Sequence, residues 1–385
     1  MQCRGAIYTG TGDHWDVVDI EVDEPRAGEV LVEWKVAGLC HSDEHMITGD
    51  MVPPDEALEM MGVGELWPMI GGHEGAGVVA AVGPGVTSVA VGDHVSASFV
   101  PSCGTCRYCC SGQQNLCDAG GGAFQKGMIT DGTSRHRVAG DGTELNMLAK
   151  LGTFAETTCV AESQVIKVDD DLPLEAVALV SCGVATGWGS ATKRAGVQTG
   201  DTVVVVGIGG IGINAVQGAR AAGARRVIAV DPIEFKRETA MELGATHSFA
   251  SMEEAFPVVT DMTEGQMADK VIMTPGVLYG DMMQLGTALA GKGGTIVVTA
   301  ISPITQTEAS INLFELAMWN KEIKGTIFGS LNPRVDIPRL LGLYRDGILK
   351  LDELVTRTYT LDQVNDGYEA MRQGENIRGV IRHGS

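Results

Sequence analysis

The chain has 385 residues, which is too long for one compact core and long enough for two domains. Hydrophobic residues make up 44% and charged residues 20%, a balance that excludes a disordered chain, and the 52 glycines follow no collagen-like repeat. The net charge of −21 repels nucleic-acid phosphates and anionic lipids, so nucleic acid and membranes are excluded as partners. No signal-peptide pattern and no apolar run of the ~18 residues needed for a membrane span is found, so we expect a cytoplasmic protein.

The first 180 residues predict short β-strands interrupted by Gly, Pro and Asp, which is typical of an antiparallel, barrel-like domain. These strands are expected within residues 29–38, 75–83, 92–100 and 154–162. From about residue 184 strands alternate with helices, as in a doubly wound parallel sheet, and we expect them within residues 202–207, 211–223, 226–231, 234–244, 270–275 and 294–300. The helical segments 337–347 and 361–374 and a last strand, 376–382, are expected to return to the first domain. The predicted domains are therefore residues 1–183 with 328–385, and residues 184–327.

Four cysteines crowd into one loop-like segment, with two residues between the first three and seven before the last: Cys103, Cys106, Cys109 and Cys117. Four thiolates so placed can close a tetrahedral zinc shell with no open position, which predicts a structural zinc ion. An iron–sulfur cluster is the alternative, but no Cys-Pro pair follows. The side chain of the adjacent Cys110 is expected to point away.

A second group of polar residues includes Cys40, His73 and Cys182. A cysteine, a histidine and a second cysteine are a known ligand set for a catalytic zinc ion, which keeps its fourth position open. Spacing in the sequence does not show that these residues meet. Cys182, on an apolar segment, fits a buried core thiol equally well, and His73 fits a turn.

A glycine motif follows the apolar run 203–206 and opens a helical segment; its glycines are Gly207, Gly209, Gly210 and Gly212. Such glycines allow a tight turn, let the backbone approach a pyrophosphate and permit close packing of the helix on the strand. Asp231 follows at the end of the next predicted strand, where an acidic side chain accepts hydrogen bonds from the adenosine ribose. Its charge disfavours a 2′-phosphate, so NAD is predicted rather than NADP.

With these three groups in this order, the chain resembles the zinc-containing medium-chain alcohol dehydrogenases over nearly its whole length. The segments LGTFAE, GTIFGS and NIRGVIR are similar to those of the bacterial NDMA-dependent, mycofactocin-associated nicotinoprotein branch. The resemblance implies an α/β protein with a GroES-like β-rich catalytic domain and a Rossmann domain, and a homo-oligomer. It also implies a primary alcohol or aldehyde as the substrate, and an NAD molecule that stays bound and is reoxidised by an external redox carrier such as mycofactocin.

Carried over position by position, the resemblance implies two zinc ions per chain. Cys40, His73 and Cys182 would bind the catalytic ion, with Glu74 behind it. Ser42 would accept the proton of the alcohol, and the relay would then run through the nicotinamide ribose to His45 and out to solvent. His41 and Arg378 would bind the pyrophosphate of the coenzyme, and Thr186 would contact the nicotinamide. Lys236 would assist Asp231 at the adenosine ribose. Phe99 would line the substrate pocket.

The segment 46–70 departs from the family pattern because it is longer, with five methionines, five acidic residues and no basic residue. We consider it either a wall of the substrate channel or a surface excursion.

An alternative function is a thiol-dependent formaldehyde dehydrogenase. Glutathione-using relatives carry an arginine soon after the last zinc cysteine, whereas residues 118–122 contain no cation. A non-catalytic NAD-binding zinc protein is the other alternative, and the joint presence of Cys40, His73, Cys182, Ser42 and His45 disfavours it.

Overall fold

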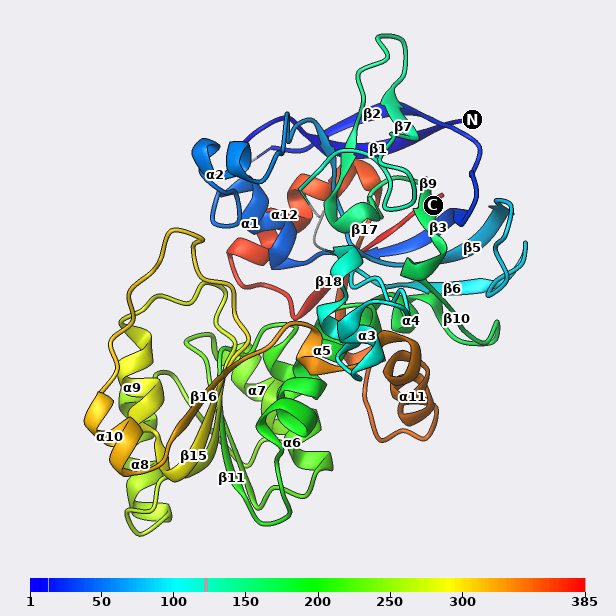
Figure 1. Cartoon of the computed structure of the whole chain (residues 1–385). Coiled ribbons are helices and arrows are strands. Elements are labelled where there is room, and N and C mark those ends of the chain that lie inside the picture. Colours follow the sequence, from blue (N-terminus) through cyan, green and yellow to red (C-terminus); the bar gives the residue numbers. More distant parts are fainter. Residues whose placement is uncertain (13, 121–123, 385) are drawn as a thin grey trace. The chain divides into compact units, whose positions relative to one another are not determined.

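A computed structural model describes residues 1–12, 14–120 and 124–384 (Figure 1). It divides the chain into two compact units. The first unit comprises residues 1–182, 332–345 and 351–385, and the second comprises residues 183–331 and 346–350. The prediction of an α/β protein with a β-rich part and a parallel-sheet part is confirmed, because the sheets of the two units differ in this way.

The first unit is built on two sheets that are antiparallel apart from one strand pair in each. One sheet has the order β7-β2-β1-β4-β8, and the other has the order β10-β6-β5-β3-β18-β17, with β9 also paired to β3. The strands are β1 Gln2–Tyr8, β2 Asp16–Val22, β3 Glu29–Gly38, β4 Met69–Ile70, β5 Glu74–Val82, β6 His94–Ala97, β7 His136–Val138, β8 Asn146–Met147, β9 Thr157–Ala161, β10 Val165–Lys167, β17 Val355–Tyr359 and β18 Arg378–Arg382. Strand β18 pairs with β3, so the end of the chain does return to the first sheet system.

The helices of the first unit are short and flank these sheets (Figure 1). They are α1 His41–Ile47, α2 Asp55–Met60, α3 Arg107–Cys110, α4 Leu174–Val180, α11 Pro333–Arg345 and α12 Val364–Arg372. An aromatic cluster fills the core beneath α1 and α12, and its rings belong to Tyr8, Trp15, Phe154 and Tyr368. Helix α1 begins directly after Cys40 and carries Ser42 and His45, so this rigid core fixes the backbone that bears these residues.

The second unit is a six-stranded parallel sheet in the order β13-β12-β11-β14-β15-β16. In Figure 1 helices α8 and α9 lie on one side of this sheet and α6 lies on the other. Its strands are β11 Thr202–Val206, β12 Arg226–Val230, β13 His247–Phe249, β14 Ala268–Met273, β15 Ala290–Val298 and β16 Glu322–Gly325. Its helices are α5 Gly183–Gly189, α6 Gly212–Ala221, α7 Glu234–Glu242, α8 Met252–Met262, α9 Met282–Ala288 and α10 Leu313–Met318.

The segment 46–70 is anchored at both ends and exposed in its middle. Met46 and Met69 lie in the aromatic core cluster and are at most 1% exposed. Helix α2 projects between them, and its last residue, Met60, is 90% exposed. The segment is therefore partly core and partly surface.

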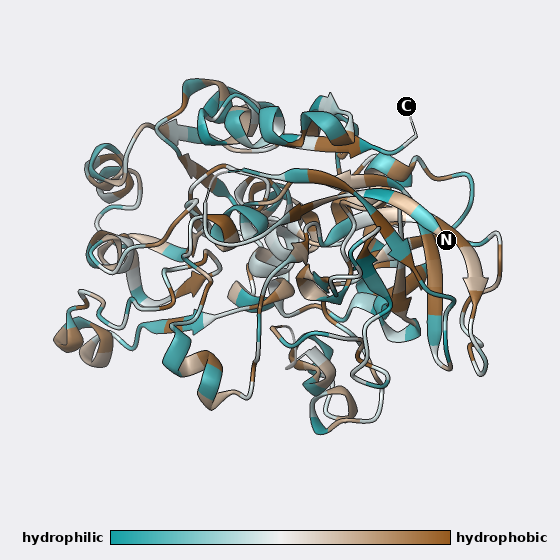
Figure 2. Cartoon of the chain, turned by 90° about the horizontal axis from the view of Figure 1, so that it is seen from above, coloured by the Kyte–Doolittle hydropathy of each residue, from teal (hydrophilic) through white to brown (hydrophobic). Residues whose placement is uncertain are grey.

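The helices of the chain alternate between hydrophilic and hydrophobic stretches in Figure 2, as expected when one face of each helix is buried. In the described residues no single helix is long and apolar enough to cross a membrane. The helical segments 174–180 and 183–195, which are joined at a bend, together have the length and composition of a membrane span. Most residues of this pair are buried.

Candidate active site and metal centres

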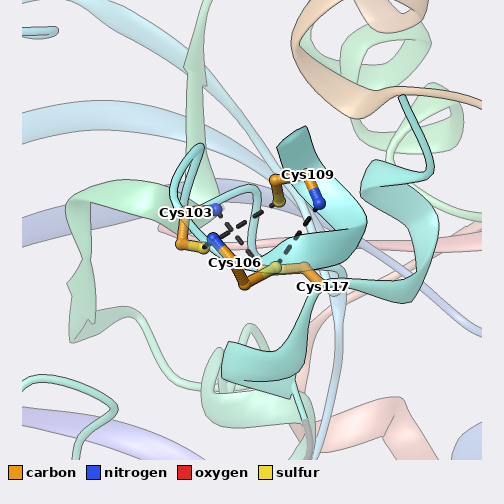
Figure 3. Close-up of side chains that lie close together, drawn as sticks. All are labelled: Cys103, Cys106, Cys109 and Cys117. Carbon is orange, nitrogen blue, oxygen red and sulfur yellow. Dashed lines mark hydrogen bonds between the residues drawn. The ribbon is translucent and has the colours of Figure 1, made fainter. Parts of the chain in front are cut away.

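Four cysteine side chains of the first unit gather at one point (Figure 3). Their sulfur atoms all lie within 4.8 Å of one another and belong to Cys103, Cys106, Cys109 and Cys117. The Sγ atoms of Cys103 and Cys109 are 3.9 Å apart. Two sulfur ligands of a tetrahedral zinc ion stand about 3.8 Å apart when the Zn–S bond is about 2.3 Å, so these thiols fit a zinc ion. Cys110 lies outside the cluster, with its Sγ 3.5 Å from the carbonyl oxygen of Thr105.

Backbone N–H groups donate hydrogen bonds to the sulfur atoms of this cluster. The N–H of Cys106 donates to Cys103 Sγ, and the N–H of Cys109 donates to Cys106 Sγ, both at 3.4 Å. Burial raises the pKa of Cys103, but the N–H donors and Thr105 outweigh burial and lower the pKa to about 6. The thiolate is the form that binds a metal, so the backbone of this loop favours the metal-binding form of Cys103. Burial instead raises the pKa of Cys109 and Cys117.

A second buried cluster of the first unit joins Cys40, His73, Glu74 and Cys182, whose candidate ligand atoms also lie within 4.8 Å of one another. Three stretches of chain meet here. Cys40 is the N-cap residue of α1 directly after β3, the His73–Glu74 pair stands at the start of β5, and Cys182 follows α4. The structure thus brings together the cysteines and histidine that sequence spacing left unconnected.

The ring of His73 is held by an aspartate that the sequence analysis did not single out. Asp43 is fully buried, and its Oδ2 lies 3.0 Å from His73 Nδ1. Its Oδ1 accepts a hydrogen bond from the Gly72 N–H at 2.6 Å. Nε2 of His73 is buried and has no hydrogen-bond partner among the described residues. A carboxylate behind a histidine is typical of metal sites, because it leaves the other ring nitrogen ready to bind the ion.

The electrostatics of this cluster favour a thiolate. The pKa of the Cys40 thiol lies well below its ordinary value, mainly because Cys182 donates a hydrogen bond to it, with a further contribution from the His73 charge. Burial raises the pKa of Glu74 to about 8, although Arg378 opposes this effect. Burial alone would lower the pKa of His73, but the charges of Cys40 and Asp43 outweigh burial and raise it. Two cysteine sulfurs and one imidazole form a donor set that suits a soft divalent cation such as Zn²⁺, which displaces the ring proton when it binds.

Arg378 lies at this cluster and forms an ion pair with Glu74. Both side chains are buried. Gly38 makes room for them, because a Cβ atom at this position would lie 2.2 Å from Glu74 Oε2. The structure therefore pairs Arg378, which the resemblance assigns to the pyrophosphate, with the glutamate of this cluster.

Of the other predicted residues of the first unit, Ser42 and Phe99 contact the same cluster. Ser42 Oγ lies 3.7 Å from Cys40 Sγ. The ring of Phe99 stands edge-on to His73, with ring centroids 5.8 Å apart. His45 is buried and its Nδ1 lies 3.0 Å from Asp50 Oδ2, whereas His41 is exposed with its ring centroid 6.0 Å from that of His45.

In the second unit, three glycines of the motif after β11 have different surroundings. Gly207 has φ +87°, in the left-handed region that favours glycine. A Cβ atom at Gly212 would lie 1.8 Å from the carbonyl oxygen of Gly207, so α6 can pack on the strand only with glycine there. A Cβ atom at Gly209 would meet nothing within 4 Å. This open position leaves the backbone accessible to a ligand.

Asp231 stands at the end of β12 and is 6% exposed. Its Oδ2 accepts a hydrogen bond from the Ile208 N–H at 2.7 Å, which ties it to the glycine turn. The described structure shows no bond between Lys236 and Asp231. Instead Arg237, which the sequence analysis missed, donates to the backbone oxygen of Asp231 at 2.8 Å.

Thr186 belongs to α5 of the second unit. Its hydroxyl oxygen is buried and has no hydrogen-bond partner among the described residues. Leaving a buried hydroxyl unpaired is costly, so this atom fits a contact to a bound group. The second unit therefore holds a glycine turn, an acidic strand end and an unpaired hydroxyl that suit a dinucleotide.

Comparison with known proteins identifies the family. Residues 26–170 match the alcohol dehydrogenase GroES-like domain, and residues 210–345 match the zinc-binding dehydrogenase domain. An NDMA-dependent alcohol dehydrogenase from Amycolatopsis methanolica is 50% identical over 100% of this chain and 99% of its own length. The chain belongs to the zinc-containing alcohol dehydrogenases. It is thus an enzyme of the alcohol dehydrogenase type, and the family uses zinc and a nicotinamide coenzyme.

Other relatives of this alcohol dehydrogenase extend the comparison. An S-(hydroxymethyl)glutathione dehydrogenase from Paracoccus denitrificans is 36% identical and covers 99% of this chain and 100% of its own length. The crystal structure of a benzyl alcohol dehydrogenase from Acinetobacter calcoaceticus superposes with a TM-score of 0.89 at 27% identity, covering 100% of both chains. The segment in which glutathione-using relatives carry an arginine, residues 118–122, includes residues 121 and 122, which lie outside the described residues.

Proposed function

We propose that this enzyme interconverts primary alcohols and aldehydes, using a zinc ion bound by Cys40, His73 and Cys182 and an NAD molecule bound by the second unit. One observation carries the proposal: the candidate ligand atoms of Cys40, His73, Glu74 and Cys182 are buried and lie within 4.8 Å of one another. With the two thiols and the imidazole as ligands and Glu74 paired with Arg378, the fourth position would be left for substrate. A zinc ion bound there supplies Lewis acidity, which lowers the pKa of the alcohol hydroxyl.

Residues of the first unit then prepare the alcohol. Asp43 fixes the orientation of the His73 ring, and Glu74 stands behind the donor set beside Arg378. Ser42, 3.7 Å from Cys40 Sγ, accepts the proton of the alcohol. The edge of the Phe99 ring packs beside His73 and excludes water from the reacting oxygen.

Ser42 passes the proton on toward His45. These residues are three positions apart on α1, so their side chains lie on the same face of the helix. Loss of the proton prepares the alcohol to give up a hydride, for which a bound NAD would supply the acceptor.

The coenzyme is proposed to bind at the turn formed by Gly207, Gly209, Gly210 and Gly212. The open position at Gly209 and the N-terminus of α6 suit a pyrophosphate. Asp231 is proposed to bind the adenosine ribose and to reject a 2′-phosphate, with Lys236 on the adjoining helix α7. The hydroxyl of Thr186 is proposed to contact the nicotinamide.

We also propose that NAD remains bound and is reoxidised in place by an external carrier such as mycofactocin. Support comes from the 50% identity with an alcohol dehydrogenase that is itself named NDMA-dependent. We further propose that the enzyme is a homo-oligomer and that the four-cysteine cluster binds a second, structural zinc ion. That cluster has the sulfur spacing of a tetrahedral zinc site but no position for substrate.

Metal analysis of cysteine variants tests the two-zinc proposal. We expect two zinc ions per chain in the wild-type enzyme and one in Cys182→Ala, which stays folded but loses turnover because its donor set is incomplete. Cys106→Ser should lose the other ion and lower the thermal midpoint, since a structural zinc ion contributes to folding. Cys110→Ser is the matched control, because Cys110 lies outside the cluster, and it should keep both ions. A single zinc ion in fully active wild-type enzyme would contradict the assignment.

A further inference from the structure

The side chain of His45 is buried, although a proton relay must end in solvent. It is 2% exposed, and its Nδ1 lies 3.0 Å from Asp50 Oδ2. Among the described residues Asp50 provides the hydrogen bond to this ring. The Asp50 side chain is 22% exposed, so its carboxylate reaches from the buried ring to the surface.

The backbone after α1 places Asp50 over His45. Helix α1 ends at Ile47, and Gly49 turns the chain with φ +89°, which favours glycine. The N–H of Met51 then donates to the carbonyl oxygen of His45 at 3.0 Å, which closes the turn on the last helical residues. The hydroxyl of Thr48 donates to Asp50 Oδ2 at 2.7 Å. The same carboxylate oxygen thus contacts both Thr48 and His45, so its orientation is fixed.

The contact sets the tautomer of the histidine. Because a carboxylate oxygen only accepts, Nδ1 of His45 carries the hydrogen and Nε2 is the basic nitrogen. We propose that Asp50 is a positioning residue of the proton relay, which orients His45 and receives the proton that the ring releases. This inference rests on the proposed function, in which His45 leads the relay to solvent.

The proton transfer balances without another reactant. His45 gains a proton at Nε2 from the direction of Ser42 and loses its Nδ1 proton to Asp50, which passes it to water. Partial burial alone would raise the pKa of Asp50, but the hydrogen bonds from His45 and Thr48 lower it overall. The carboxylate is therefore ionised near neutral pH and releases the proton rapidly to solvent.

Chemical rescue of the Asp50→Asn holoenzyme tests this role. We expect kcat to fall roughly tenfold to hundredfold, the usual effect of removing a group that orients a reacting one. KM should stay within about twofold, because substrate binding is not altered. Added imidazole should restore most of kcat, since a small base can accept the proton that Asp50 no longer receives. Asp50→Glu should keep most of the activity because it retains a carboxylate.

The controls separate this role from a structural one. Asp55→Asn removes the same charge from an exposed position at the start of α2 and should behave as wild type. Thr48→Val keeps the carboxylate but removes its second donor, and we expect a smaller loss of kcat that imidazole also repairs. Thr48→Val decides the question if Asp50→Asn does not fold.

Two results would overturn the inference. One is a normal kcat in Asp50→Asn together with a low kcat in His45→Ala. That result would contradict the role of Asp50 but not the proposed role of His45. The other is a loss in the folded variants that no added base repairs. A normal kcat in His45→Ala would instead contradict the relay of the proposed function itself.

Discussion

The carboxylate of Asp231 is held by backbone N–H groups on both sides. Oδ2 accepts from Ile208 at 2.7 Å and Oδ1 accepts from Ile233 at 2.9 Å. These bonds keep the negative charge at the strand end, where a 2′-phosphate of NADP would be repelled. A carboxylate held in this way can reject NADP by repulsion as well as bind NAD.

Replacing Asp231 with serine should therefore relax coenzyme choice. We expect the ratio of NADPH to NADH affinity in Asp231→Ser to rise about tenfold or more, equivalent to at least about 1.4 kcal/mol. Binding titrations with coenzyme-free enzyme measure this ratio. Glu234→Gln removes a nearby exposed charge from α7 and should leave the ratio unchanged. Wild-type enzyme that binds both coenzymes equally would refute the role given to Asp231.

His136 makes stability depend on pH. Its ring is buried, Nε2 accepts the Cys159 N–H at 3.0 Å, and burial lowers the pKa to about 3. The unfolded chain binds a proton near pH 6.5 while the folded chain does not until about pH 3. The contribution of His136 is therefore fully present above pH 6.5 and is lost as the pH falls toward 3, by up to ~1.4 kcal/mol per pH unit.

Denaturant unfolding at pH 7 and pH 5 checks this expectation. In His136→Gln, which keeps an acceptor but does not titrate, the difference in unfolding free energy between the two pH values should be smaller than in wild type. The exposed His14 offers a control, since His14→Gln should keep the wild-type difference. An unchanged pH dependence in His136→Gln would show that other groups cause it.

At the scale of elements, two glycines of the turn have different roles: Gly212 lets α6 pack on the strand, and Gly209 is proposed to leave room for the coenzyme. Gly212→Ala places a methyl group against the Gly207 carbonyl oxygen, so we expect α6 to shift and the free energy of unfolding to fall by about 1–3 kcal/mol. Gly209→Ala meets no protein atom within 4 Å and should keep wild-type stability while weakening NAD binding. Thermal unfolding and coenzyme titration of the pair measure both effects. Equal destabilisation by the two variants would argue against this division of roles.

Strands and helices with regular patterns were predictable from the sequence. The predicted strand 29–38 coincides with β3, and the two-part fold class is confirmed. Strand β1 was not predicted because buried residues occupy its last four positions in a row, without alternation. Helix α8 was not predicted either, and it contains Pro257, which usually marks the end of a helix.

Contacts between distant residues explain what the sequence analysis of the site omitted. Asp43 follows the predicted Ser42 in the sequence, but its role depends on a contact with His73 thirty residues later, which spacing does not reveal. The pairing of Glu74 with Arg378 depends on β18 returning beside β3, although both residues had been singled out separately. Likewise, only the register of α7 determines that Arg237 rather than Lys236 contacts Asp231 in the described structure.

At the scale of the whole molecule, the candidate metal ligands and the glycine turn proposed to bind the coenzyme lie in different units. Both cysteine clusters belong to the first unit, and the glycine turn with Asp231 belongs to the second. Cys182 is the last residue of the first unit before the chain continues into α5. We propose that this division lets the coenzyme be held by one unit throughout turnover while the alcohol and the acceptor exchange.

Retention of NAD through the catalytic cycle is the prediction that concerns the whole enzyme. Coenzyme that survives gel filtration at about 1 μM protein needs a Kd near 1 nM, or about −12 kcal/mol of binding free energy. The purified enzyme should then oxidise an alcohol with a nitroso-aniline acceptor and no added NAD. Because the alcohol reduces the resident coenzyme before the acceptor removes the hydride, the kinetics should be ping-pong. Gly209→Ala, with weakened binding, should require added NAD, since its loaded fraction follows mass action. If wild-type enzyme is inactive until NAD is supplied, it uses a dissociable coenzyme, and the zinc assignments are unaffected.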